Sequence, residues 1–138
     1  MSTHSKPEAA RRVSMLAALV IAGCVRGYPM PVGQPEEVRL AAVAVRPADY
    51  EDRYVSFVGT LTGETSTGCE YATAGVVLAT PEPSIVYLVL CLAPAAAQQV
   101  SQMPQGTRLH VAGTSREVAT RYGARAFVYV TRVDPAGQ

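Results

Sequence analysis

The chain has 138 residues, a length that fits a single domain. Hydrophobic residues make up 49% and charged residues 17%, which argues against disorder and allows a buried core. The formal charge is +1 overall, and residues 1–23 contribute +2 through Lys6, Arg11 and Arg12 against Glu8, so the remainder carries −1. A general nucleic-acid-binding protein normally has a strong basic excess, and this near-neutral charge argues against that class.

The first 23 residues have the pattern of a secretory signal peptide. A polar stretch ends in the pair Arg11-Arg12, and residues 13–23 then carry no charge. This apolar run is shorter than the roughly 20 residues that a membrane-spanning helix needs. The alternative is a short buried helix of the mature domain, but Pro29, Pro31 and Pro35 separate the run from everything that follows.

The end of the apolar run, Ile21-Ala22-Gly23-Cys24, resembles the lipobox of bacterial lipoproteins. The resemblance implies cleavage before Cys24 and attachment of three acyl chains to that residue, which suffice for stable membrane anchoring. An ordinary secreted protein with a chance cysteine is the alternative. By analogy with Gram-negative lipoproteins, Val25 in place of an aspartate after the cysteine implies the outer membrane, with the domain facing the periplasm. Residues 24–35 are then expected to form a flexible tether.

The remaining cysteines, Cys69 and Cys91, form an even pair if Cys24 is lipidated. In an exported chain such a pair favours a disulfide, which we expect to join the second and third strands of the domain. Two unpaired buried thiols are the alternative. A metal site is disfavoured, because the chain has no CxxC motif and only one histidine, His110, after the signal segment.

Residues 36–134 read as three strands, one helix and two strands, preceded by a short helix and followed by a tail at 135–138. Alternating apolar residues and turn signals predict this order. The segment 36–46 fits a helix or a strand, and we favour the helix because Glu36 and Glu37 would lie at the positive end of its dipole. The other expected elements are strands at 54–61, 70–79 and 85–92, a helix at 94–101, and strands at 107–114 and 125–133, with a polar connection at 63–68 and a charged loop at 115–124.

This order is that of the OB-fold, a five-stranded barrel with a helix between its third and fourth strands. The motifs Val55-x-Phe57-x-Gly59-x-Leu61 and Gly106-x-x-Leu109-x-Val111-x-Gly113 resemble those of small exported OB-like lipoproteins and of the tRNA-anticodon-binding-like OB family. They are packing motifs, so the resemblance implies the fold and carries no activity. A small β-sandwich is the alternative.

Arginines are concentrated near the C-terminus, where residues 108–132 contain one acid, Glu117. Guanidinium groups suit phosphates and carboxylates, and the connection between the last two OB strands borders the ligand face. We therefore take this segment as a candidate site for an anionic ligand, with Tyr122 available for stacking. The alternative is a solvated surface that balances the acidic first half. The arginines are Arg108, Arg116, Arg121, Arg125 and Arg132.

The sequence offers no catalytic set, because His110 has no second base or free nucleophile predicted beside it. We therefore expect a non-enzymatic binding module of the cell envelope, without cofactor or metal, that binds a protein or an anionic surface. A single-stranded nucleic-acid-binding OB module is one alternative, disfavoured by the charge and by the expected compartment. An envelope hydrolase is the other, disfavoured by the missing catalytic residues.

Overall fold

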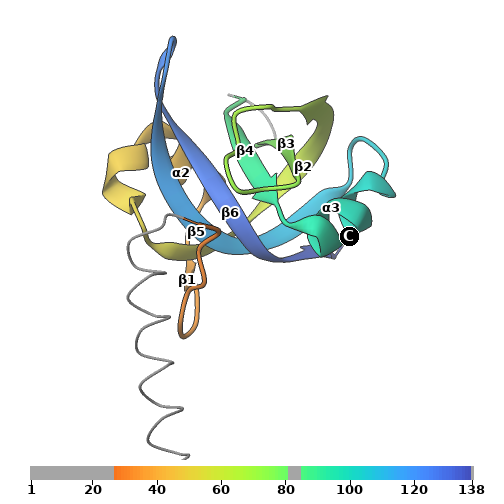
Figure 1. The fold of residues 1–138 in the computed structure, drawn as a ribbon. Coiled ribbons are helices and arrows are strands. Elements are labelled where there is room, and N and C mark those ends of the chain that lie inside the picture. Colours follow the sequence, from red (N-terminus) through yellow and green to blue (C-terminus); the bar gives the residue numbers. More distant parts are fainter. Residues whose placement is uncertain (1–26, 81–84, 138) are drawn as a thin grey trace, which may run out of the picture.

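The computed structural model describes residues 27–80 and 85–137, and the signal segment, Cys24 and the predicted turn around residue 82 lie outside them. The main body is a barrel of five strands (Figure 1). Its elements are β1 (Glu36–Glu37), α2 (Leu40–Val45), the 3-10 helix η2 (Pro47–Tyr50), β2 (Tyr54–Thr65), β3 (Ala74–Ala79), β4 (Tyr87–Leu92), α3 (Pro94–Ser101), β5 (Arg108–Thr120) and β6 (Gly123–Pro135).

The barrel closes because β2 pairs with both β3 and β5, and β4 pairs with β6. The β4–β6 pair is parallel, whereas β2–β3, β3–β4, β5–β6 and β2–β5 are antiparallel. Helix α3 connects β4 to β5, which completes the topology of the OB-fold. The predicted fold class is confirmed, and closure into one barrel rules out the alternative of a β-sandwich.

The core fills the inside of the barrel with alternate residues of each strand. Val55 and Phe57 of β2, which belong to the packing motif of this strand, face inward, and Phe57 pairs with Val111 of β5. Val100 of α3 joins the same core, as do the two buried side chains of α2. The core residues with at most 2% exposure include Leu40, Val43, Leu78, Leu88, Leu90, Leu92, Leu109 and Val128.

The segment predicted as a helix over 36–46 is split into two elements. Glu36 and Glu37 form β1, which pairs in parallel with Val55 and Ser56, and the helix begins only at Leu40. The N–H of Val38 donates to the carbonyl of Ser56, so the backbone here is satisfied by strand pairing rather than by a helical turn. The prediction that the acidic pair lies at the positive end of the helix is therefore wrong. Glu36 instead forms an exposed ion pair with Arg53.

Half of the predicted connection at 63–68 and most of the predicted loop at 115–124 are strand. Strand β2 continues to Thr65, and β5 and β6 continue as a hairpin with ladder pairs from Ser115↔Val128 to Thr120↔Gly123. The turn is only Arg121 and Tyr122, so the hairpin projects beyond the barrel (Figure 1). This stretch is a twisted two-stranded ribbon whose backbone groups pair with each other. Its charged composition is also typical of a loop, so composition alone did not predict the strands.

The pairing of β5 with β6 is interrupted at Gly113, where the register shifts by one residue after Ala112. A Cβ at this position would lie 2.4 Å from the backbone carbonyl oxygen of Tyr129, so the strands approach too closely for any side chain. Two strands of the closed barrel meet there, and this contact requires glycine.

We expect Gly113→Ala to lower the free energy of unfolding by about 1–3 kcal/mol, because the strand pair must separate to admit the methyl group. The measurement is urea unfolding followed by circular dichroism. Gly27→Ala is the matched control, since a Cβ there meets nothing within 4 Å. Equal unfolding midpoints for the two variants would contradict this account of the bulge.

Candidate binding face

The sheet formed by β3, β4 and β6 is apolar on its outer face as well as toward the core. Val77 pairs with Val89, and Val89 pairs with Phe127, in a row that runs across all three strands on the outside of the barrel. Their neighbours Leu78, Leu88 and Val128 point into the core. The face of a sheet that meets water is normally polar, so an apolar outer face indicates either that another segment covers it or that a partner binds it.

One half of the outer face is covered by the connection between β2 and β3, residues 66–73. The predicted disulfide between Cys69 and Cys91 is present, with a Cα–Cα distance of 5.6 Å. Cys69 lies in this connection and not in a strand, so the prediction that the bond joins two strands is wrong. The cross-strand partner of Cys91 is Gly75, where a Cβ would lie 2.6 Å from the carbonyl oxygen of Ser66. The missing side chain lets the connection fold back over β3 and bring Cys69 to Cys91.

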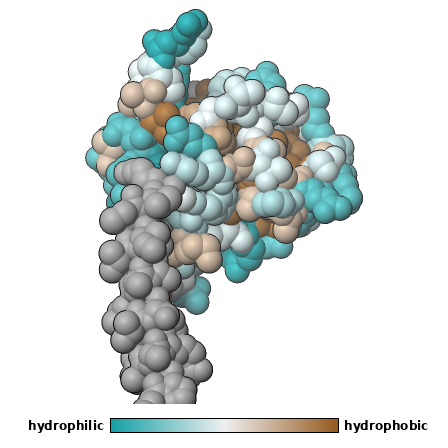
Figure 2. All heavy atoms as spheres, in the orientation of Figure 1, coloured by the Kyte–Doolittle hydropathy of each residue, from teal (hydrophilic) through white to brown (hydrophobic). Residues whose placement is uncertain are grey.

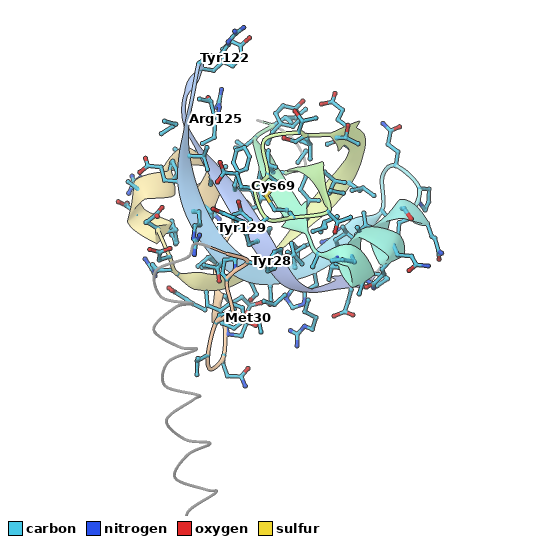
Figure 3. The ribbon with its side chains drawn as sticks, in the orientation of Figure 1. Tyr28, Met30, Cys69, Tyr122, Arg125 and Tyr129 are labelled. Carbon is cyan, nitrogen blue, oxygen red and sulfur yellow. A yellow bond between two sulfur atoms is a disulfide. The ribbon has the colours of Figure 1, made fainter. Side chains whose placement is uncertain are left out.

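Tyr28 covers the same half from the N-terminal side (Figure 3). Its hydroxyl donates toward the backbone carbonyls of Cys91 and Val130, and its ring meets that of Tyr129 edge-on with centroids 5.4 Å apart. Burial raises the pKa of Tyr28 to about 12. Contacts with the barrel thus begin within the segment 24–35 that was expected to be a flexible tether, although its first residues lie outside the described part. No sequence pattern signalled this role for a tyrosine beside prolines.

The other half of the face is open and forms a groove between the β3–β4 strands and the β5–β6 hairpin. The groove has a volume of about 980 Å³. Tyr87, Tyr122 and Ile85 are 59%, 74% and 49% exposed, so large apolar side chains meet water along it. Figure 2 shows apolar surface below the projecting hairpin. We call this the open groove; its lining includes Val77, Ile85, Tyr87, Val89, Tyr122, Arg125 and Phe127, with Glu64 and Thr65 at its edge.

The five predicted arginines do not form one patch. Arg108 lies at the start of β5, opposite Thr60 of β2, and the hairpin turn with Arg121 lies at the far end of the same strand. Arg132 is 3.6 Å from Asp134 in an exposed ion pair. Arg116 bonds Asp52 at 3.1 Å, with its guanidinium 5.8 Å from the ring centroid of Tyr129.

Arg125 alone of these arginines lines the open groove, and Tyr122 lines it beside the hairpin turn. The candidate anionic site therefore reduces from five guanidinium groups to one, set among apolar and aromatic side chains.

The described residues contain no group of three or more histidines, cysteines or acids placed to hold a metal ion. His110 lies on β5 opposite Val58, on the side of the barrel formed by β2 and β5 and away from the open groove. Within residues 27–80 and 85–137, no helix has the length and apolar character needed to cross a membrane.

No protein-family model and no curated protein matches this chain. Among solved structures, a protein from Leishmania major described as an aspartyl-tRNA synthetase is similar over 86% of this chain and 25% of its own, with a TM-score of 0.50 at 13% identity. A mitochondrial single-stranded DNA-binding protein of S. cerevisiae covers 64% of this chain, with 99% of its own length, a TM-score of 0.47 and 12% identity. The likeness to the first supports the OB-fold and nothing finer.

We expect the double variant Cys69→Ala/Cys91→Ala to lose about 3 kcal/mol of stability, because the unfolded chain gains the entropy of an open loop. Urea unfolding measures the loss. Reductant should destabilise the unchanged protein by a similar amount and leave the double variant unaffected. A loss below about 1 kcal/mol would show that packing alone holds the connection.

Alkaline pH should destabilise the protein through Tyr28. Because burial raises the pKa of this phenol from 10 to about 12, the folded state keeps the proton more tightly than the unfolded state. The stabilisation is complete below pH 10 and disappears as the pH rises toward 12. Tyr28→Phe should reduce this alkaline loss, measured as the urea midpoint between pH 8 and pH 11.5. Part of the loss should remain, since burial also raises the pKa of Tyr129. An unchanged alkaline slope in the variant would contradict the burial of the phenol.

Proposed function

We propose that this chain is a lipid-anchored, non-enzymatic binding module of the bacterial cell envelope, and that it binds a protein partner in the open groove. The observation that carries the proposal is the apolar half of the β3–β4–β6 outer face that no segment within residues 27–80 and 85–137 covers. Tyrosine and arginine are enriched at the centres of protein interfaces, and the open groove presents Tyr87, Tyr122 and Arg125. One guanidinium among apolar side chains suits a segment with hydrophobic residues and a single carboxylate.

A nucleic-acid ligand is less well supported by the same groove. Single-stranded nucleic acid needs a basic track along its phosphates in addition to aromatic stacking surfaces. Arg125 is accompanied at the groove by Glu64, and Arg116 already pairs with Asp52. The aromatic side chains alone would not retain a polyanion at physiological salt.

Envelope anchoring rests on the Ile21-Ala22-Gly23-Cys24 pattern and is supported by the disulfide, since oxidised cysteine pairs are typical of exported proteins. Produced in a Gram-negative host, the protein should lose residues 1–23 and gain acyl mass on Cys24, and it should fractionate with the outer membrane. Intact-mass spectrometry and membrane fractionation measure this. Cys24→Ser should remain unprocessed. A full-length chain without acyl mass would overturn the anchoring, and fractionation with the inner membrane would overturn the sorting.

Site-specific photo-crosslinking in the native host tests the groove. A photoreactive amino acid at Tyr87 should give a discrete adduct with one protein, whereas the same amino acid at Gln98, exposed on α3, should not. Arg125→Glu in the Tyr87-labelled chain should abolish the adduct. With the partner purified, Tyr87→Ala should weaken binding at least tenfold, because it removes a central aromatic contact. Equal adducts from both positions would refute the groove as the binding site.

A fluorescent thymidine oligonucleotide provides the direct test of the alternative ligand. We expect no change in its anisotropy with the protein at physiological salt. Salt-sensitive binding that Tyr87→Ala and Arg125→Ala both weaken would instead identify single-stranded nucleic acid as the ligand.

A further inference from the structure

Met30 and Val32 stand out from every other large apolar side chain in the described residues. Their exposed fractions are 85% and 93%, higher than those of the groove residues. Both lie in residues 29–34, which we call the apolar loop and which also contains Pro29, Pro31 and Gly33. The loop projects from the lower edge of the barrel in Figure 1. Single exposed apolar residues are ordinary on protein surfaces, but two of them within three residues of one restrained loop form a small apolar contact surface.

The apolar loop is held at both of its ends. Before it, Tyr28 is fixed by its bonds to the carbonyls of Cys91 and Val130 and by the ring of Tyr129. After it, Glu36 and Glu37 pair with β2. The prolines further restrict the backbone between these anchors. Met30 and Val32 are therefore presented in a defined direction relative to the barrel, rather than carried on a free chain.

The chain length between Cys24 and this loop limits where the loop can be. Tyr28 is the fourth residue after Cys24, so the two Cα atoms are at most about 14 Å apart even in a fully extended chain. If Cys24 carries acyl chains, the point where Tyr28 joins the barrel must therefore remain close to the lipid headgroups. The apolar loop begins at the residue after Tyr28, so it has the bilayer surface within reach.

We propose that the apolar loop seats the domain on the bilayer by inserting Met30 and Val32 into its interfacial region. This inference rests on the proposed lipidation of Cys24. The occupant is the lipid surface that receives the acyl chains of the same molecule. Insertion removes two apolar side chains from water without further folding, since the loop is already ordered, and it adds an attachment point that fixes the domain's orientation.

The orientation that follows places the open groove away from the membrane. Met30 and Tyr122 lie at opposite ends of the molecule in Figure 3, with Tyr28 and Tyr129 between them. A domain seated on Met30 therefore directs the hairpin turn and the open groove toward the aqueous compartment, where a partner can reach them.

The test uses the lipidated full chain reconstituted in phosphatidylcholine–phosphatidylglycerol vesicles that contain a spin-labelled lipid. Met30→Cys and Val32→Cys, each labelled with a fluorophore sensitive to polarity, should show a blue-shifted emission and at least twofold quenching by the spin label. Tyr122→Cys, labelled in the same way, is the control at the far end and should show neither. Equal emission and quenching at positions 30 and 122 would overturn the inference.

A second set of variants keeps the result specific to the loop. Here the fluorophore is placed on Gln34→Cys, at the end of the apolar loop, and its quenching by the spin-labelled lipid is measured. Changing both Met30→Ser and Val32→Ser should abolish this quenching while the protein still floats with the vesicles. Val45→Ser, at a 65% exposed apolar position on α2, should leave the quenching unchanged. Quenching that survives the double change would overturn the role of these two side chains.

The two proposals fail in different ways. Loss of vesicle flotation together with absence of acyl mass would refute the anchor at Cys24. A protein that carries acyl mass and floats, but whose label at position 30 stays in water, would refute only the seating of the apolar loop.

Discussion

The arrangement of this molecule depends on one constraint, the apolar outer face of the β3–β4–β6 sheet. The barrel core needs only the inward side chains, yet Val89, Phe127 and Tyr129 repeat the apolar pattern on the outside. The chain covers half of that face with two segments that arrive from different directions. The half that the described residues leave uncovered is the open groove, so the position of the candidate site is set by how far the two covering segments extend.

The first covering segment needs a covalent bond because it has little apolar surface of its own. Residues 66–73 contain mainly small and polar side chains, and burial of Cys69 and Ala72 is its main contribution to the outer cluster. Such a loop gains too little from the hydrophobic effect to offset the entropy of ordering it. The disulfide to Cys91 supplies the restraint. The second segment needs no such bond, because the ring of Tyr28 buries its own apolar surface and bonds two backbone carbonyls.

The sequence was sufficient for the barrel and for the Cys69–Cys91 disulfide, and insufficient for the other features on the outside of the barrel. Alternation through Val55 and Phe57, and Pro94 at the start of α3, are local signals, and local signals fix the order of elements that defines the OB-fold. The strand character of 115–120 depends on pairing with β6, and the docking of Tyr28 depends on carbonyls 63 and 102 residues away. Long-range contacts of this kind leave no periodic trace. The grouping of arginines in the sequence was misleading for the same reason. Arg108 begins the thirteen-residue strand β5 and Arg121 follows its last residue, so the two lie far apart.

The separation of the molecule into two ends has a mechanical consequence for any binding in the open groove. If Cys24 is lipidated, as proposed, Tyr28 follows the anchor by four residues, and a domain held to the barrel at Tyr28 cannot move far from the bilayer. If the groove lay beside Tyr28, lipid headgroups would obstruct it. Covering that half of the sheet therefore removes no surface that a partner could reach. The hairpin with Tyr122 and Arg125 lies at the opposite end (Figure 3), where its length carries the groove wall into the solvent. The covered and open halves of one sheet are thus the halves nearest to and farthest from the proposed anchor.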